Sequence, residues 1–262
     1  MGFAALGASA LCGASAAALS PRPATVPLAS TVCQPNLPTT VLVHGLDSSK
    51  ETWSTVLGTL VSRGYPALAL DLRGHGESPF GPPDDFSADA LARDVWDAVV
   101  AHGIRGPVVL VGHSMGGRVA MRCATLSEAS NEWRHEGAPP HLAAVIIEDM
   151  DLRVRAGNEL VLAPGREDLK GWARAEGRLF ASWEAAKKAL LKWYPGQEGR
   201  VDSWKGKRVR PTAGGAWWSD LNPAAQHMAR ERVLASTDGF EAWDTLAARA
   251  KAANLAFPVH VW

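Results

Sequence analysis

The chain has 262 residues, 47% of them hydrophobic, which is enough for one large core or for a core with a small subdomain. Lysine plus arginine and aspartate plus glutamate number 27 each, and this zero net charge argues against a nucleic acid or another polyanionic partner. The three cysteines, Cys12, Cys33 and Cys123, are too few for a disulfide framework and lack metal-ligand spacing, so no metal site is expected.

The first 37 residues differ in kind from the rest. They are rich in alanine and serine, and no acidic residue precedes Asp47. This composition favours a leader for a plastid, a mitochondrion or the secretory pathway, and it does not favour a stable membrane span. The alternative is a disordered tail or an over-extended gene start, which would leave the protein in the cytoplasm.

Strands and helices alternate from residue 38 onward. Short apolar runs predict strands at 39–45, 65–72, 106–112 and 142–149. Helical patterns lie at 48–64, with Ser48 and Glu51 at capping-box spacing, and at 87–103, with Ser87 as N-cap. We therefore expect an α/β fold with a doubly wound, mostly parallel sheet.

The run VVLVGHSMGGRVAM, residues 108–121, passes from a buried strand through glycines into a helix. Gly-x-Ser-x-Gly in this setting is the nucleophile elbow, which holds one hydroxyl above the sheet. Ser114 is thus the predicted nucleophile.

Two further turns, LVHGLDSS and DLRGHGES, precede this one in register with the strands. Together the three turns resemble the α/β-hydrolase superfamily, specifically its compact esterase-like members, over about residues 39–152. The resemblance implies an acyl-enzyme on Ser114, with the backbone N–H groups of Met115 and Leu46 as the oxyanion hole. It implies no cofactor and a small-molecule ester or acyl substrate.

The triad acid and base are harder to place. In one esterase branch the acid stands at the end of the fourth strand, which matches Asp149 best and Glu148 or Asp151 less well, whereas other members carry it one strand later. His44, His75 and His113 match family positions that brace loops. The remaining histidines lie in expected surface, cap or strand positions, so the catalytic histidine is expected beyond residue 262.

Residues 153–254 interrupt the alternation, at the place where the family inserts a helical cap. Helices are expected over 172–196 and 222–236, and the basic stretch 200–210 is expected to be a solvated loop. Seven of the eleven tryptophans lie in this segment, where they suit either an acyl pocket or packing of cap against core.

The final residues, FPVHVW, match the start of the family's next core strand. At about 30 residues per strand–helix–strand unit, roughly 45 to 60 residues of the pattern would follow, so we expect a C-terminally truncated domain over 38–262 with its last strands missing. The predicted function is hydrolysis of carboxylic esters or thioesters. A non-catalytic ligand-binding or scaffold protein on the same fold, a carbon–carbon bond hydrolase and an acyltransferase are the alternatives, and the sequence leaves the oligomeric state open.

Overall fold

The computed structural model describes residues 37–81, 85–128, 141–154, 172 and 178–262. The predicted leader, apart from residue 37, lies outside these ranges, as do Cys12 and Cys33. No helix in the described ranges is long and apolar enough to cross a membrane.

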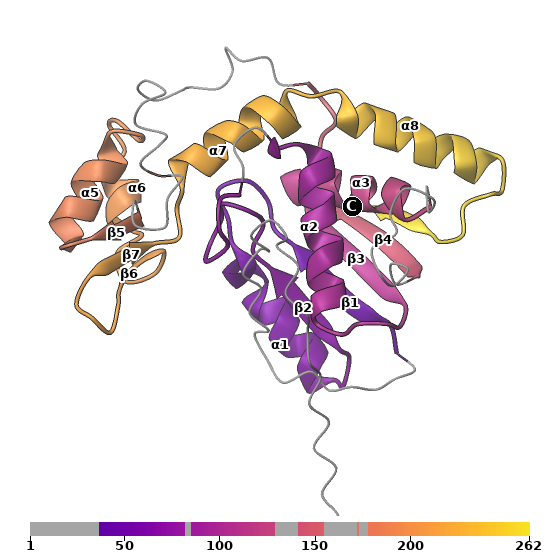
Figure 1. Ribbon diagram of the computed structural model, residues 1–262, viewed down its shortest axis with the longest axis horizontal. Helices are drawn as coiled ribbons and strands as arrows, with labels where there is room; N and C mark the ends of the chain where they lie inside the picture. The colour runs from indigo at the N-terminus through magenta and orange to yellow at the C-terminus, as the bar shows by residue number, and fades with distance from the viewer. Residues whose placement is uncertain (1–36, 82–84, 129–140, 155–171, 173–177) are drawn as a thin grey trace, which may run out of the picture.

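A five-stranded parallel sheet forms the centre of the molecule (Figure 1). Its order is β2-β1-β3-β4-β8, and the strands are β1 (Thr39–Val43), β2 (Ala67–Leu70), β3 (Val108–His113), β4 (Leu142–Glu148) and β8 (Val259–Val261). The four strands predicted before the cap segment are confirmed, each within two residues at either end. The run FPVHVW contributes β8, which pairs in parallel with β4 at the edge of the sheet.

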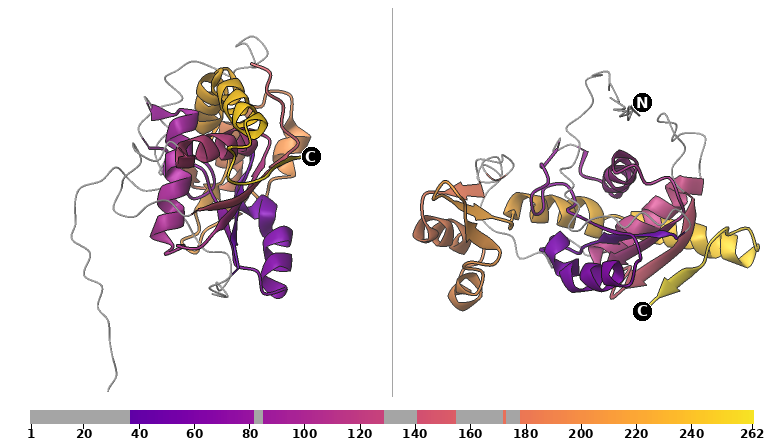
Figure 2. Two further views of the ribbon diagram at one scale, coloured as in Figure 1. Left: turned by 90° about the vertical axis from the view of Figure 1, so that its right-hand side faces the viewer. Right: turned by 90° about the horizontal axis from the view of Figure 1, so that it is seen from below.

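Helices cover both faces of the sheet, as the two sides of Figure 2 show. They are the 3-10 turn η1 (Lys50–Trp53) with α1 (Ser54–Ser62), then α2 (Ala88–Ala101), α3 (Met115–Glu128) and α8 (Asp238–Lys251). Leu42 and Ala69 pack with Trp53 and Leu57 on one face. The residues next to Leu42 in β1 and next to Ala69 in β2 face the other side of the sheet, because successive side chains of a strand alternate. The expected doubly wound α/β fold is therefore confirmed.

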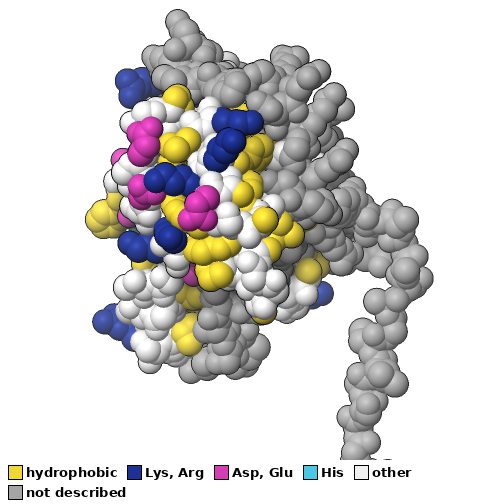
Figure 3. Space-filling model, turned by 90° about the vertical axis from the view of Figure 1, so that its left-hand side faces the viewer, with side chains coloured by type: hydrophobic (Ala, Val, Ile, Leu, Met, Phe, Trp, Pro, Cys, Tyr) yellow, Lys and Arg dark blue, Asp and Glu magenta, His cyan; other side chains and the backbone are white. Residues whose placement is uncertain are grey.

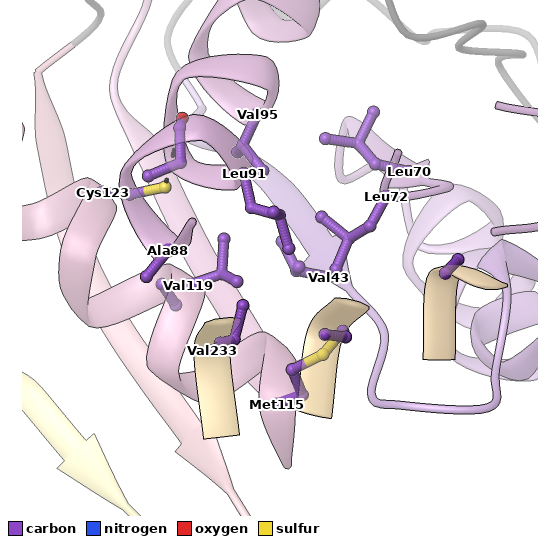
Figure 4. Close-up of a cluster of buried hydrophobic side chains, with 14 of the residues drawn as sticks. Val43, Leu70, Leu72, Ala88, Leu91, Val95, Met115, Val119, Cys123 and Val233 are labelled. Carbon is purple, nitrogen blue, oxygen red and sulfur yellow. Dashed lines mark hydrogen bonds between the residues drawn. The ribbon is translucent and has the colours of Figure 1, made fainter. Parts of the chain in front are cut away.

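The core on the α2 and α3 side is continuous. Leu91 and Val95 of α2 meet Val119 and Cys123 of α3 above the strand residue Val43 (Figure 4). All five side chains are at most 1% exposed. Burial raises the pKa of the Cys123 thiol above its ordinary value, which keeps it in the unreactive protonated form.

Of the two helix caps predicted from the sequence, one is confirmed and the other is wrong. The Ser87 hydroxyl accepts a hydrogen bond from Ala90 N–H at 3.1 Å and caps α2 as predicted. The predicted capping box of Ser48 and Glu51 is wrong, because the first turn is a 3-10 turn whose N-cap residue, Ser49, makes no side-chain capping bond. The Ser48 hydroxyl instead bonds the hydroxyl of Thr52.

Residues 178–234 are here called the cap lobe; residues 178–222 lie to one side of the sheet, and residues 223–234 lead from there back toward α3 (Figure 1). The lobe contains β5 (Leu179–Phe180), α5 (Trp183–Leu191), α6 (Glu198–Asp202), β6 (Val209–Pro211), β7 (Trp217–Ser219), α7 (Pro223–Ala229) and the π-helical turn η5 (Arg230–Leu234). Its three strands form an antiparallel sheet in the order β5-β7-β6. The helix α8, which also falls in the predicted cap segment, packs along α3 instead.

The single helix expected over 172–196 is wrong. Leu179 and Phe180 pair with β7, and α5 begins only after Ser182, whose hydroxyl accepts a hydrogen bond from Ala185 N–H at 3.1 Å. Strand pairing with a segment almost 40 residues away overrides the local helical pattern. Aromatic rings of the lobe pack against one another, as with Tyr194 and Trp204, whose centroids are 5.0 Å apart.

The helix expected over 222–236 is found in two parts, α7 and the π-helical turn η5. Asn222 caps α7, and Pro223 occupies its first turn. The stretch 200–210 is the expected solvated loop only in its middle, where residues 203–208 form turns and most of them are exposed. Its ends belong to α6 and β6, and Arg210 forms an ion pair with Asp220.

Candidate active site

Ser114 occupies the turn between β3 and α3. Its φ is +52°, a left-handed conformation that is uncommon for a residue other than glycine and that persists only where the surroundings impose it. Ser114 N–H donates to Glu148 O at 2.9 Å, and Gly117 N–H donates to Ser114 O at 2.8 Å. These bonds hold the turn between the neighbouring strand and the first turn of α3.

The turn is packed against the end of β1. A Cβ atom on Gly116 would lie 2.5 Å from Val43 O, so only glycine permits this approach. A Cβ atom on Gly45 would lie 3.1 Å from Ser114 Cβ. The backbone at Gly45, the residue before Leu46, therefore runs directly beside the predicted nucleophile.

His44 orients the peptide that carries Leu46 N–H. Leu72 N–H donates to His44 Nε2 at 3.1 Å, so Nε2 is an acceptor and the ring proton is on Nδ1. Nδ1 in turn donates to Gly45 O at 2.8 Å. The C=O and N–H of a trans peptide point in opposite directions, so this bond turns Leu46 N–H away from the imidazole. Burial lowers the pKa of His44, which favours this neutral form.

Met115 begins α3, so its N–H has no carbonyl one turn earlier in the helix to bond. Its side chain is buried in the core (Figure 4), which leaves only its backbone for the site. An N-terminal amide of a helix, with the helix dipole behind it, favours negative charge.

Three carboxylates follow or end β4, and their surroundings differ. Asp149 has φ +44° and a side chain that is 91% exposed, with Oδ2 4.0 Å from His113 Nε2. Asp151 lies 3.6 Å from the buried guanidinium of Arg118 and 3.1 Å from Arg153. Glu148 is exposed and stands opposite His113 in the register of β4 and β3. Asp149 thus lies at the same sheet edge as Ser114, with its carboxylate accessible.

Seven of the eight histidines lie in the described ranges, and His135 lies outside them. His44 and His75 are buried, and burial lowers the pKa of His75 to about 3. His227 pairs with Glu231 at 3.1 Å, and His102 bonds Ala98 O at 2.8 Å.

The other three histidines differ in position. His260 is exposed on the edge strand β8, and His141 is exposed immediately before β4. His113 is the residue before Ser114, and its Nδ1 is buried near Gly45. Chain position therefore brings only His113 next to the nucleophile.

A buried ion cluster, which the sequence did not indicate, supports the turn after β1. Lys50 Nζ lies 2.7 Å from Asp71 Oδ2 and 2.8 Å from Glu77 Oε2. Asp71 also accepts backbone N–H bonds from Lys50 and Glu77, at 2.7 and 3.0 Å. The cluster joins the segments that follow β1 and β2, and no local pattern identifies its partners because they are more than 20 residues apart.

The cap lobe is fastened to the turn after β2. The Arg178 guanidinium donates to Gly76 O and Ser78 O, and it stacks 4.3 Å from the Trp218 ring. Burial lowers the pKa of Arg178 to about 10. Basic, acidic and hydrophobic side chains are interspersed over the described part of the lobe's outer face (Figure 3).

Among the described residues no group of three or more histidine, cysteine, aspartate or glutamate side chains is arranged to hold a metal ion. The groups that the structure places around the Ser114 turn are a hydroxyl, neighbouring backbone amides and the Asp149 carboxylate at the same sheet edge.

Comparison with known proteins agrees with this arrangement. The model of the alpha/beta hydrolase family matches residues 40–262. Protein phosphatase methylesterase 1 of Homo sapiens is 40% identical over 91 residues, which are 34% of this chain and 24% of that protein. The sn-1-specific diacylglycerol lipase ABHD11 of Mus musculus is 42% identical over 89 residues, 34% of this chain and 28% of that one. These alignments span about a quarter of the length of the curated relatives.

Solved structures show the same fold. A marine microorganism esterase has a TM-score of 0.51 at 16% identity, over 77% of this chain and 70% of that one. The thioesterase domain from the curacin biosynthetic pathway has a TM-score of 0.51 at 20% identity, over 87% of this chain and 75% of that one. The family model, which matches most of the chain, decides the assignment: the protein belongs to the alpha/beta hydrolase family.

Proposed function

We propose that the protein is a serine hydrolase that cleaves carboxylic esters or thioesters through an acyl-enzyme on Ser114. The observation that carries the proposal is the contact between two backbone segments. The strained turn at Ser114 lies beside Gly45, and Gly45 O is held by His44, which supports Leu46 N–H and Met115 N–H as the two donors to the proposed oxyanion. The names of the curated relatives, a methylesterase and a lipase, support an ester substrate.

In the proposed reaction, Ser114 Oγ attacks the acyl carbonyl carbon and gives its proton to a general base. The carbonyl oxygen becomes an oxyanion, which Leu46 N–H and Met115 N–H stabilise. The C–O or C–S bond then breaks, and the alcohol or thiol leaves with the proton from the base. Water attacks the acyl-enzyme by the same route and releases the carboxylic acid and free Ser114.

Asp149 is proposed as the acid that orients the base, because its carboxylate is accessible at the edge of the sheet where β3 ends. Asp151 fits this role less well because it pairs with Arg118. We further propose that the described histidines do not act as the base. His44 and His75 are buried beneath the turns, and His227 pairs with Glu231 on the cap lobe. His113 adjoins Ser114 in the chain, but its Nδ1 is buried against Gly45.

The test is labelling by a fluorophosphonate probe, on the 262-residue chain and on the protein purified from its natural source. Ser114→Ala should abolish labelling. Ser203→Ala, which removes an exposed hydroxyl on the cap lobe, should leave it unchanged. Labelling that survives in Ser114→Ala would overturn the proposal by showing that another residue is the nucleophile. A protein that is unlabelled from both sources would overturn it in favour of a non-catalytic binding protein.

The oxyanion hole is tested by a matched pair at one position. Leu46→Pro removes the backbone N–H, whereas Leu46→Ala keeps it. The loss of one such donor costs on the order of 100-fold to 1,000-fold in turnover, so Leu46→Pro should fall in that range and Leu46→Ala should stay near wild type. Circular dichroism of both variants reports whether they fold. Equal turnover of two folded variants would exclude Leu46 N–H as a donor.

A further inference from the structure

Two arginines of the cap lobe converge on Asp47, the residue after Leu46. Arg208, between α6 and β6, donates a hydrogen bond from Nη1 to Asp47 O. Arg230, at the start of η5, places Nη2 3.5 Å from Asp47 Oδ2. One cap arginine therefore holds the backbone of Asp47, and the other lies beside its carboxylate.

Asp47 is in a conformation that needs such support. Its φ is +59°, which costs an ordinary residue free energy and which aspartate tolerates better than most. Residues 45–48, here called the oxyanion loop, are held at their start by the bond from His44 Nδ1 to Gly45 O. The bonds from the cap lobe hold the far side of the same loop. Leu46 N–H shares a rigid peptide plane with Gly45 O, so its direction follows the backbone from Gly45 to Asp47. The bonds to Gly45 O and Asp47 O restrain this backbone from both sides.

The contacts to Asp47 are separate from the other contacts that fasten the lobe. Arg178 bonds Gly76 O and Ser78 O, and Arg210 pairs with Glu77 and Asp220. Both arginines act on the turn after β2. Loss of Arg208 should therefore release the oxyanion loop while the lobe stays attached.

We infer that Arg208 and Arg230 are positioning residues that set the oxyanion loop through Asp47, so that docking of the cap lobe and alignment of Leu46 N–H are coupled. This inference rests on the proposed function of Ser114 and Leu46. It assigns the cap lobe a part in stabilising the transition state. Neither arginine touches the reacting atoms.

The first measurement is the NMR order parameter of the loop amides in the free protein, which does not depend on activity. Arg208→Gln removes the bond to Asp47 O and should lower the order parameters of Leu46, Asp47 and Ser48 from about 0.85, the value of a rigid backbone, to below about 0.6. Asp47→Asn keeps a residue that tolerates positive φ but removes the charge beside Arg230, and it should lower them less. The matched control, Lys187→Gln, breaks an ion pair with Asp202 inside the cap lobe and should leave these order parameters unchanged.

The second measurement is turnover of p-nitrophenyl butyrate by protein that the fluorophosphonate labels. Arg208→Gln should lower kcat about tenfold or more with KM within about twofold, because an oxyanion interaction is made in the transition state and not with the bound ester. Arg208→Lys should restore part of kcat, and Lys187→Gln should keep wild-type kcat.

The outcomes separate the two proposals. Unchanged order parameters in Arg208→Gln, or an equal fall in Lys187→Gln, overturn the inference whatever the activity. Lower order parameters of the loop with unchanged kcat overturn the positioning role and leave the proposed function standing. If the wild-type protein is neither labelled nor active, the proposed function fails and the positioning role fails with it, even where the order parameters respond.

Discussion

His44, directly after β1, is linked to Leu72, just after β2, because its Nε2 accepts a hydrogen bond from Leu72 N–H at 3.1 Å. His75 lies against it, with ring centroids 5.1 Å apart, and donates from Nδ1 to Arg73 O at 3.0 Å. Both rings are buried, and burial lowers the pKa of each. The turns around the site thus depend on two imidazoles that stay neutral.

The first prediction is a loss of stability in mild acid. Because the pKa of His75 is lowered to about 3 from 6.5, the unfolded chain binds a proton between these values that the folded chain does not. Stability is therefore complete above pH 6.5 and falls as the pH falls toward 3. His75 alone should lower the free energy of unfolding by about 2 kcal/mol between pH 7.5 and pH 5.0.

Urea unfolding at the two pH values measures this loss. His75→Gln should reduce the difference between them, whatever its effect on stability at pH 7.5. His260→Gln, which removes an exposed imidazole on β8, serves as the control and should retain the wild-type difference. A difference unaffected by His75→Gln would show that His75 does not contribute.

The second prediction concerns two glycines in helices. Gly116→Ala puts a Cβ atom 2.5 Å from Val43 O and 2.6 Å from His44 O, and neither backbone oxygen can move without distorting β1. We expect a loss of about 3 kcal/mol or more in the free energy of unfolding, or no folded protein. Gly199→Ala, in α6, meets no atom within 4 Å and should stabilise by about 0.5–1 kcal/mol. Thermal melts of both variants make the comparison, and similar melts would contradict it.

The third prediction separates two neighbouring aspartates. Asp149→Asn should lower ester turnover at least about 100-fold, as loss of a triad acid does, with little change in melting temperature because the carboxylate is 91% exposed. Asp151→Asn should keep turnover and lower the free energy of unfolding by about 1–3 kcal/mol, because it weakens the contact to buried Arg118. Turnover and melting temperature are measured for both variants. The reverse pattern would make Asp151 the proposed acid. Equal losses of turnover in the two variants would show that Asp149 is not the only candidate for the acid.

The sequence by itself determined the elements and turns of the sheet. Strand patterns, the cap at Ser87 and the turn at Ser114 depend on residues close together in the chain, so their physical causes can be read locally. The helix expected over 172–196 failed for the opposite reason, because pairing of Leu179 and Phe180 with β7 outweighed local preference.

Only the tertiary structure decided which charged groups meet. Lys50 bonds Asp71, which is 21 residues away in the sequence, and Arg208 bonds Asp47 O, which is 161 residues away. No periodic pattern in the sequence reveals the partner of an arginine or a lysine. Their side chains are long and flexible, so each can pair with any acceptor that the fold brings near. The sequence therefore identified the hydroxyl and the amides of the candidate site, and the packing of the cap lobe on the sheet decided what holds them in place.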